Sequence, residues 1–181
     1  MRLSEKRLEE IKELVVNMYE EFEIACVPIN AFEIATKMGI KVFPYSAYSE
    51  KKRALMLRQS EDGFNVMKYD DTFCIFYNDE KRYGRINNTI MHEIGHIVMD
   101  HSQDSELAEK EVKFFAKYAL APPVLIHKYK LNNADSIARM FDISYEAARY
   151  ALDYYHKWLI FGAKNYTPYE LKILKLFEEA V

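Results

Sequence analysis

Apolar and polar positions alternate with helical spacing at the start of the chain. Apolar residues recur every three or four positions from Leu8 to Phe22, which predicts an amphipathic first helix. Asn30-Ala31-Phe32-Glu33 then has the form of a capping box, and Gly39 is suited to end a helix. These two signals predict a second, short helix over about residues 31–38.

Short apolar segments follow and predict a sheet. Four segments rich in β-branched, aromatic or large apolar residues have strand-like character: 40–43, 54–58, 64–69 and 73–77. Turn-forming residues separate the later ones. Because the segments are closely spaced, we expect a small antiparallel sheet of three or four strands.

Helical patterns return after Tyr83 and continue towards the end of the chain. They predict helices over about 85–99, 105–120, 134–141 and 144–160, and a last one that begins at the capping signal Thr167-Pro168-Tyr169-Glu170. The predicted fold class is α+β, a small antiparallel sheet followed by a mainly helical C-terminal half. We expect one unit over residues 1–125 and a helical extension over 126–181 packed on it.

The sequence His92-Glu93-Ile94-Gly95-His96 lies inside the first of these later helices. Residues four apart share a helix face, so both imidazoles can bind one metal ion, which gives a catalytic zinc site. Glu93 lies about 60° around the helix axis from His96, beside the metal, where it can accept a proton from water.

The pattern also arises by chance on amphipathic helices. Here, however, Ile86, Ile90, Ile94 and Ile97 form a separate apolar face, so the core does not need the histidines. Gly95 is costly inside a helix, and a close backbone approach at that point would explain its presence.

Two histidines require a third protein ligand, with water in the fourth position. His101 follows His96 by five residues, whereas the extended metzincin pattern needs six, so we expect His101 to lie near the site or at the surface. In the next helix Glu111 falls inside the apolar arc, and Glu106 and Glu109 fall outside it. A carboxylate on a buried face must be paired or bound to a cation. Glu111 is therefore the predicted third metal ligand, and a buried salt bridge, for example with Arg85, is the alternative.

Composition limits the kinds of partner. The chain has 25 Lys and Arg against 28 Asp and Glu, a net charge of −3, which does not fit a general nucleic-acid binder. The first residues are charged and lack the apolar run of a signal peptide, and no apolar stretch approaches the roughly 20 residues of a membrane span. Cys26 and Cys74 lie in apolar surroundings and are expected to be buried free thiols. We expect a cytoplasmic protein.

The stretch from Arg85 to Pro122 resembles the ImmA/IrrE metallopeptidases. The family pattern has an arginine several residues before the HExxH helix, where Arg85 stands, and a later segment Glu-Ala-x-x-Phe-Ala that ends in a proline. Here that segment is Glu111-Val112-Lys113-Phe114-Phe115-Ala116, with Pro122 after it and valine in place of the alanine. The resemblance covers roughly residues 25–150 and assigns the third-ligand role to Glu111 as well.

The resemblance implies a gluzincin-like zinc endopeptidase. Members of the family commonly act inside bacteria or are carried by phages and mobile elements. Their typical substrates are helix-turn-helix repressors, which they cleave or inactivate to relieve repression.

The alternative is a regulator that binds a repressor or DNA through its helical C-terminal region without cleaving anything. Residues 136–144 are similar to the first helix and turn of a DNA-binding motif. From Pro122 onwards, however, eight Lys and Arg stand against seven Asp and Glu, whereas DNA binding needs several cations on one face. A helical pair packed on the catalytic part is therefore the preferred interpretation of this region.

Overall fold

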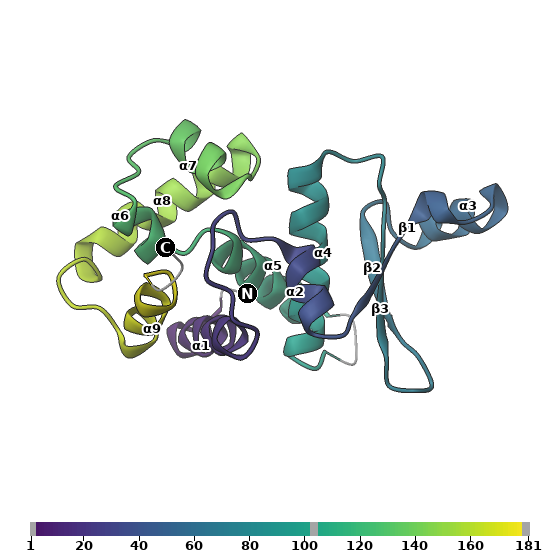
Figure 1. Ribbon diagram of the computed structural model, residues 1–181, viewed down its shortest axis with the longest axis horizontal. Coiled ribbons are helices and arrows are strands. Elements are labelled where there is room, and N and C mark those ends of the chain that lie inside the picture. Colours follow the sequence, from purple (N-terminus) through teal and green to yellow (C-terminus); the bar gives the residue numbers. More distant parts are fainter. Residues whose placement is uncertain (1–2, 102–104, 179–181) are drawn as a thin grey trace.

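The computed structural model describes residues 3–101 and 105–178. The elements of the N-terminal half are α1 (Glu5–Glu21), α2 (Ala31–Lys37), β1 (Lys41–Pro44), the 3-10 turn η1 (Tyr45–Ala47), α3 (Glu50–Gln59), β2 (Gly63–Met67) and β3 (Phe73–Tyr77). They are followed by α4 (Tyr83–Val98), α5 (Glu106–Leu120), α6 (Pro123–Lys128), α7 (Ala134–Phe141), α8 (Tyr145–Phe161) and α9 (Pro168–Leu176). The sheet and α3 lie at one end of the molecule, α4 and α5 in its middle, and α6 to α9 at the other end (Figure 1). The predicted α+β class is confirmed.

Local signals define the helix ends much as the sequence predicts. The Asn30 side chain accepts hydrogen bonds from the backbone N–H groups of Phe32 and Glu33 and so caps α2. Gly39 has a φ of 74°, a left-handed conformation that ends this helix at little cost for glycine. The capping box of α9 is present, with the Thr167 side chain and the Glu170 side chain each bonded to the other residue's backbone N–H.

The sheet differs from the prediction in two ways: one predicted strand is helical, and one strand pair is parallel. Its order is β1-β3-β2, with β2 antiparallel to β3 but β1 parallel to it. The predicted strand over 54–58 lies inside α3 instead. Residues 51–58 read Lys-Lys-Arg-Ala-Leu-Met-Leu-Arg, all good helix formers without a β-branched residue, so the short apolar run at 54–58 forms part of a helix and not a strand. The segment from η1 to β2 allows the chain to return with β1 parallel to β3.

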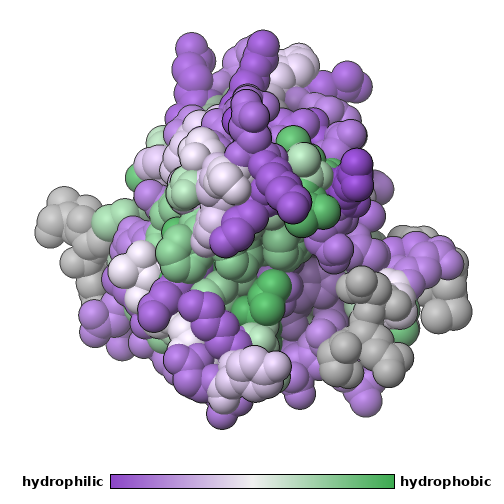
Figure 2. Space-filling view, turned by 90° about the vertical axis from the view of Figure 1, so that its right-hand side faces the viewer, coloured by the Kyte–Doolittle hydropathy of each residue, from purple (hydrophilic) through white to green (hydrophobic). Residues whose placement is uncertain are grey.

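The two faces of the sheet have different environments. Val42 and Ile75 are register partners that pack into the core, and Asn65 lies opposite Ile75 on the same face. On the other face the rings of Phe43, Phe76 and Phe64 stack across the three strands, with centroid distances of 5.6 and 5.3 Å. Figure 2 looks onto this end of the molecule and shows hydrophobic residues gathered at its centre, with hydrophilic residues around them.

A single cluster of buried residues extends from Ile11 in α1 to Phe177, just after α9. The C-terminal helices contribute Ile137, Tyr155 and Ile173 to it. The boundary between residues 125 and 126 stays a prediction. Helix α6 was not predicted from the sequence; Pro123 occupies its first turn, where proline is well tolerated.

Two further features concern the state of the cysteines and the length of the helices. Cys26 and Cys74 are both free thiols, but only Cys74 is buried, so the expectation of two buried cysteines is wrong for Cys26. In the described parts of the chain, none of the helices has the length and apolar character needed to cross a membrane.

Gly95 lies where side chains of α5 pack directly against the backbone of α4. A Cβ atom built on Gly95 would lie 3.0 Å from Cδ1 of Phe115 and 3.4 Å from Cγ1 of Val112. The close approach that the sequence suggested at Gly95 is therefore confirmed, and its partner is a pair of buried α5 side chains.

We predict that Gly95→Ala destabilises the protein relative to the matched variant Gly84→Ala at the start of the same helix. At Gly84 an added Cβ would meet its nearest neighbour at an ordinary 3.4 Å. Overpacking at Gly95 costs about 1–3 kcal/mol and opposes the gain in helix propensity of about 1 kcal/mol. Denaturant unfolding of both variants measures the difference, and equal stabilisation by both would contradict the packing constraint.

Candidate metal centre

Helix α4 separates its apolar face from its histidine face. Ile86, Ile90 and Ile94 are buried in the core, whereas His92 and His96 are partly accessible on another side of the helix. The two imidazole rings have centroids 5.0 Å apart, as their i, i+4 spacing requires. The predicted pairing of the two histidines on one face is present.

Glu109 of α5 completes a group of three potential ligands with these histidines. Its Oε1 atom lies 3.6 Å from Nε2 of His92 and 3.3 Å from Nε2 of His96. Within residues 3–101 and 105–178, this is the one group of His, Cys, Asp and Glu whose ligand atoms lie within 4.8 Å of one another. Two atoms that bind zinc tetrahedrally at about 2.0–2.1 Å are about 3.4 Å apart, so these separations fit a shared ion.

The electrostatics of the group also suit a cation. Burial lowers the pKa of His92, which keeps its imidazole neutral at neutral pH and able to donate a lone pair. Partial burial raises the pKa of the Glu109 carboxyl, but His92, Lys113 and His96 outweigh this and the net pKa is lowered. The group thus offers two imidazole nitrogens and one carboxylate, which is a donor set found in catalytic zinc sites.

Glu93 is buried between α4 and the sheet. The Nδ2 group of Asn65, in β2, donates a hydrogen bond of 2.7 Å to Oε2 of Glu93. A Cβ on Gly63 at the start of β2 would lie only 2.7 Å from Cγ2 of Thr89, so this glycine lets the strand lie directly against α4. Asn65 was not predicted as a site residue, because its proximity to Glu93 depends on how β2 packs on α4.

The model of the IrrE N-terminal-like domain, peptidase family M78, matches residues 35–153, well over half of the chain. The chain belongs to the ImmA/IrrE metallopeptidase family. In a comparison with curated proteins, none matched it. The matched segment contains the sheet, the HExxH helix and α5, so the chain carries the metallopeptidase domain of the ImmA/IrrE family with a possible His-His-Glu metal site.

Glu111, the ligand predicted from the sequence, lies elsewhere in this ImmA/IrrE domain. Its carboxylate accepts hydrogen bonds from Arg7 of α1, with Nε–Oε1 at 2.7 Å and Nη2–Oε2 at 2.9 Å. His101 lies between Glu111 and His96. Its Nε2 is 3.0 Å from Glu111 Oε2, and its Nδ1 is 3.2 Å from His96 Nδ1. The structure therefore brings Glu109, and not Glu111, to the Nε2 side of the histidine pair.

Arg85, which fits the arginine of the family pattern, does not pair with Glu111. Its guanidinium donates to both carboxylate oxygens of Asp62 in the turn before β2, at 2.6 and 2.8 Å. The buried salt bridge that the sequence offered as an alternative for Glu111 exists, but its partner is Arg7. The Arg85–Asp62 pair instead links the start of α4 to the turn that leads into β2.

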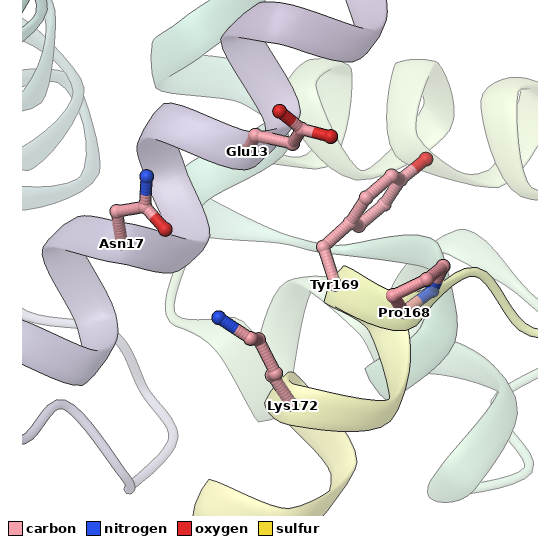
Figure 3. A pocket seen from close by; sticks show the side chains of 5 residues that line it. All are labelled: Glu13, Asn17, Pro168, Tyr169 and Lys172. Atoms are coloured by element: carbon pink, nitrogen blue, oxygen red, sulfur yellow. The ribbon is translucent and has the colours of Figure 1, made fainter.

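A pocket lies between α1 and α9 (Figure 3). It is lined by Glu13, Asn17, Pro168, Tyr169 and Lys172, and none of these residues belongs to the metal-binding group.

We predict that Glu109→Gln weakens Zn²⁺ binding by more than about 100-fold, because loss of a residue that merely supports a ligand already costs about 10–100-fold. The matched control is Glu106→Gln, one turn earlier on α5, where the carboxylate pairs with Lys110. This variant should bind Zn²⁺ like the unmodified protein. Calorimetric titration of both proteins measures the effect, and equal affinities would remove Glu109 from the site.

Proposed function

We propose that this protein is a zinc-dependent metalloendopeptidase in which His92, His96 and Glu109 hold the metal and Glu93 is the general base. The observation that carries this proposal is the convergence of the two Nε2 atoms and Glu109 Oε1 within a domain of the M78 peptidase family. Glu109 takes the ligand role that the sequence analysis gave to Glu111. Two imidazoles and one carboxylate leave a coordination position for water or substrate, as hydrolytic zinc sites require.

A bound zinc ion would supply Lewis-acid chemistry, polarising the scissile carbonyl and lowering the pKa of a water molecule to about 7. Glu93 follows His92 directly on α4 and so lies beside the ligand group. Its carboxylate is suited to accept the proton of the attacking water and to pass it to the leaving amine. The hydrogen bond from Asn65 fixes the rotation of this carboxylate.

A protein substrate is implied by the family, and the sheet offers a way to bind one. In the described residues β2 is an edge strand that pairs with β3 alone, and its Val66 and Met67 are exposed. Extended peptides commonly add to such an edge through main-chain hydrogen bonds. Because Asn65 in this strand contacts Glu93, a peptide bound along β2 would pass close to the general base.

The proposed substrate is a DNA-binding repressor with a helix-turn-helix, cleaved or inactivated in the cytoplasm to relieve repression. This part rests on the resemblance to ImmA/IrrE metallopeptidases, whose genes are commonly found in phages and mobile elements. Mass spectrometry of repressors encoded near the gene, incubated with the protein, would identify the fragments.

We predict that Glu93→Gln lowers substrate turnover by about 10²–10⁴-fold or more, because a neutral amide cannot act as general base. Zinc content should stay at about one ion per chain, since Glu93 is not a proposed ligand. Cleavage assays and elemental analysis of the same preparations measure the two effects.

Pull-down of the substrate separates an enzyme from a regulator that only binds a repressor. The Glu93→Gln variant should still capture its substrate. Undiminished release of repression by this variant in cells would refute the peptidase mechanism even with zinc present.

We further predict that Asn65→Ala lowers kcat by about 10–100-fold, the equivalent of the 1.5–3 kcal/mol of a hydrogen bond to a charged group. Zinc content should not change. Asn88→Ala, at an exposed position of α4, is the matched control and should retain full activity. Unchanged kcat in Asn65→Ala would show that Glu93 does not need this donor.

A further inference from the structure

The three-stranded sheet packs on the buried core through one of its two faces. Val42 and Ile75 point to that core, whereas the residues next to them in each strand, Phe43 and Phe76, point away from it and are half-buried. Helix α3 lies at the same end of the molecule without covering this outer face (Figure 1). None of its residues 50–59 is buried, and its main contacts are with η1.

The outer face presents the edges of aromatic rings. Phe43, Phe76 and Phe64 are register partners on neighbouring strands, and their rings stack with interplanar angles of 25° and 24°. Because their centroids are 5.6 and 5.3 Å apart, close to the spacing of the strands, the rings stand upright on the sheet and do not lie flat on it. Nucleic-acid bases stack on ring faces, whereas a ridge of ring edges suits the aliphatic side chains of a protein.

The apolar surface continues beyond the three rings. Val66 follows Phe64 on the same face of β2, and it is exposed, as is Leu55 of α3. Figure 2 shows hydrophobic residues gathered at the centre of this end of the molecule and hydrophilic residues around them. An exposed apolar patch with a polar border is typical of a protein interaction site.

Lysine side chains border the rings and give this surface a charge preference. Nζ of Lys68 lies 6.0 Å from the centre of the Phe43 ring, and Nζ of Lys52 lies 5.9 Å from the centre of the Tyr48 ring, which itself contacts Phe76. Within the described residues neither lysine forms an ion pair, so both ammonium groups are available to a partner. The surface therefore complements a partner that is apolar and acidic.

We propose that the aromatic face, formed by Phe43, Phe64, Val66 and Phe76, docks an apolar and acidic surface of the folded protein substrate. This inference rests on the proposed function, because it gives the proposed peptidase substrate a second contact. Strand β2 joins the two contacts, since Phe64 and Val66 point to the aromatic face and Asn65 between them contacts Glu93. A substrate docked on the rings would have its adjoining segment beside the β2 edge.

The first test uses a designed amphipathic helical peptide whose leucine stripe is flanked by glutamates, and a counterpart in which lysines replace the glutamates. In NMR titrations of the full-length protein, the glutamate peptide should shift the signals of Phe43, Phe64 and Val66. It should bind about 10-fold or more tightly than the lysine peptide, because like charges across an interface oppose binding. The difference should shrink as the salt concentration rises.

A matched pair of charge reversals tests the role of the lysines. Lys52→Glu combined with Lys68→Glu should reverse the preference between the two peptides. The control combines Lys157→Glu with Lys175→Glu, which makes the same change in net charge at exposed positions of α8 and α9. This control should keep the preference of the unmodified protein. All four lysines are exposed, so both double variants should fold.

The second test measures binding of the repressor itself, with every protein carrying Glu93→Gln so that nothing is cleaved. The Lys52 and Lys68 reversal should weaken repressor binding about 10-fold or more, and the control reversal should not. Equal affinity for the two peptides, signal shifts confined to other surfaces, or undiminished repressor binding by the Lys52 and Lys68 variant would each overturn the proposal. Because these measurements detect binding without turnover, an absence of peptidase activity would contradict the proposed function and leave the docking result unaffected.

Discussion

Helices α4 and α5 can approach closely because Gly95 has no side chain, and the two halves of the metal site lie on these two helices. Phe115 and Val112 occupy the space that a Cβ at this position would need. The histidines follow from α4 alone, but their distance to Glu109 depends on how near α5 lies. One glycine in the HExxH segment therefore serves packing and, through packing, the geometry of the ligands.

The histidine pair was predictable because helical spacing of four residues is a local property. The position of Glu109 beside this pair was not, because burial on the next helix singles out Glu111 instead. Glu111 is indeed buried, but its partner Arg7 comes from a helix more than 100 positions away, which no local pattern reveals. Glu109, with a side chain 40% exposed, lies at the edge of the buried face. A hydrolytic site must admit substrate, so a ligand at the edge of the core is physically reasonable.

The same distinction between local and long-range information explains the fold. Helix ends were predicted from caps such as Asn30 and Thr167, which act within three residues. The parallel pairing of β1 with β3 and the position of Asn65 beside Glu93 depend on contacts between distant segments. The segment that forms α3 was misread because a short apolar run fits a strand or a helix equally well, and its helix-forming residues were given too little weight.

Three carboxylates lie close to the two histidines, and each of them has different partners. Glu111 is neutralised by the guanidinium of Arg7, so it has little remaining attraction for a second cation. Glu93 receives a neutral amide donor from Asn65, which orients the carboxylate without bringing a positive charge to it. Glu109 faces the two imidazoles directly, and its cationic neighbour Lys113 contacts the other oxygen, Oε2, at 3.4 Å. Since these residues are all glutamates on two adjacent helices, their different electrostatic settings follow from what each one contacts and not from its residue type.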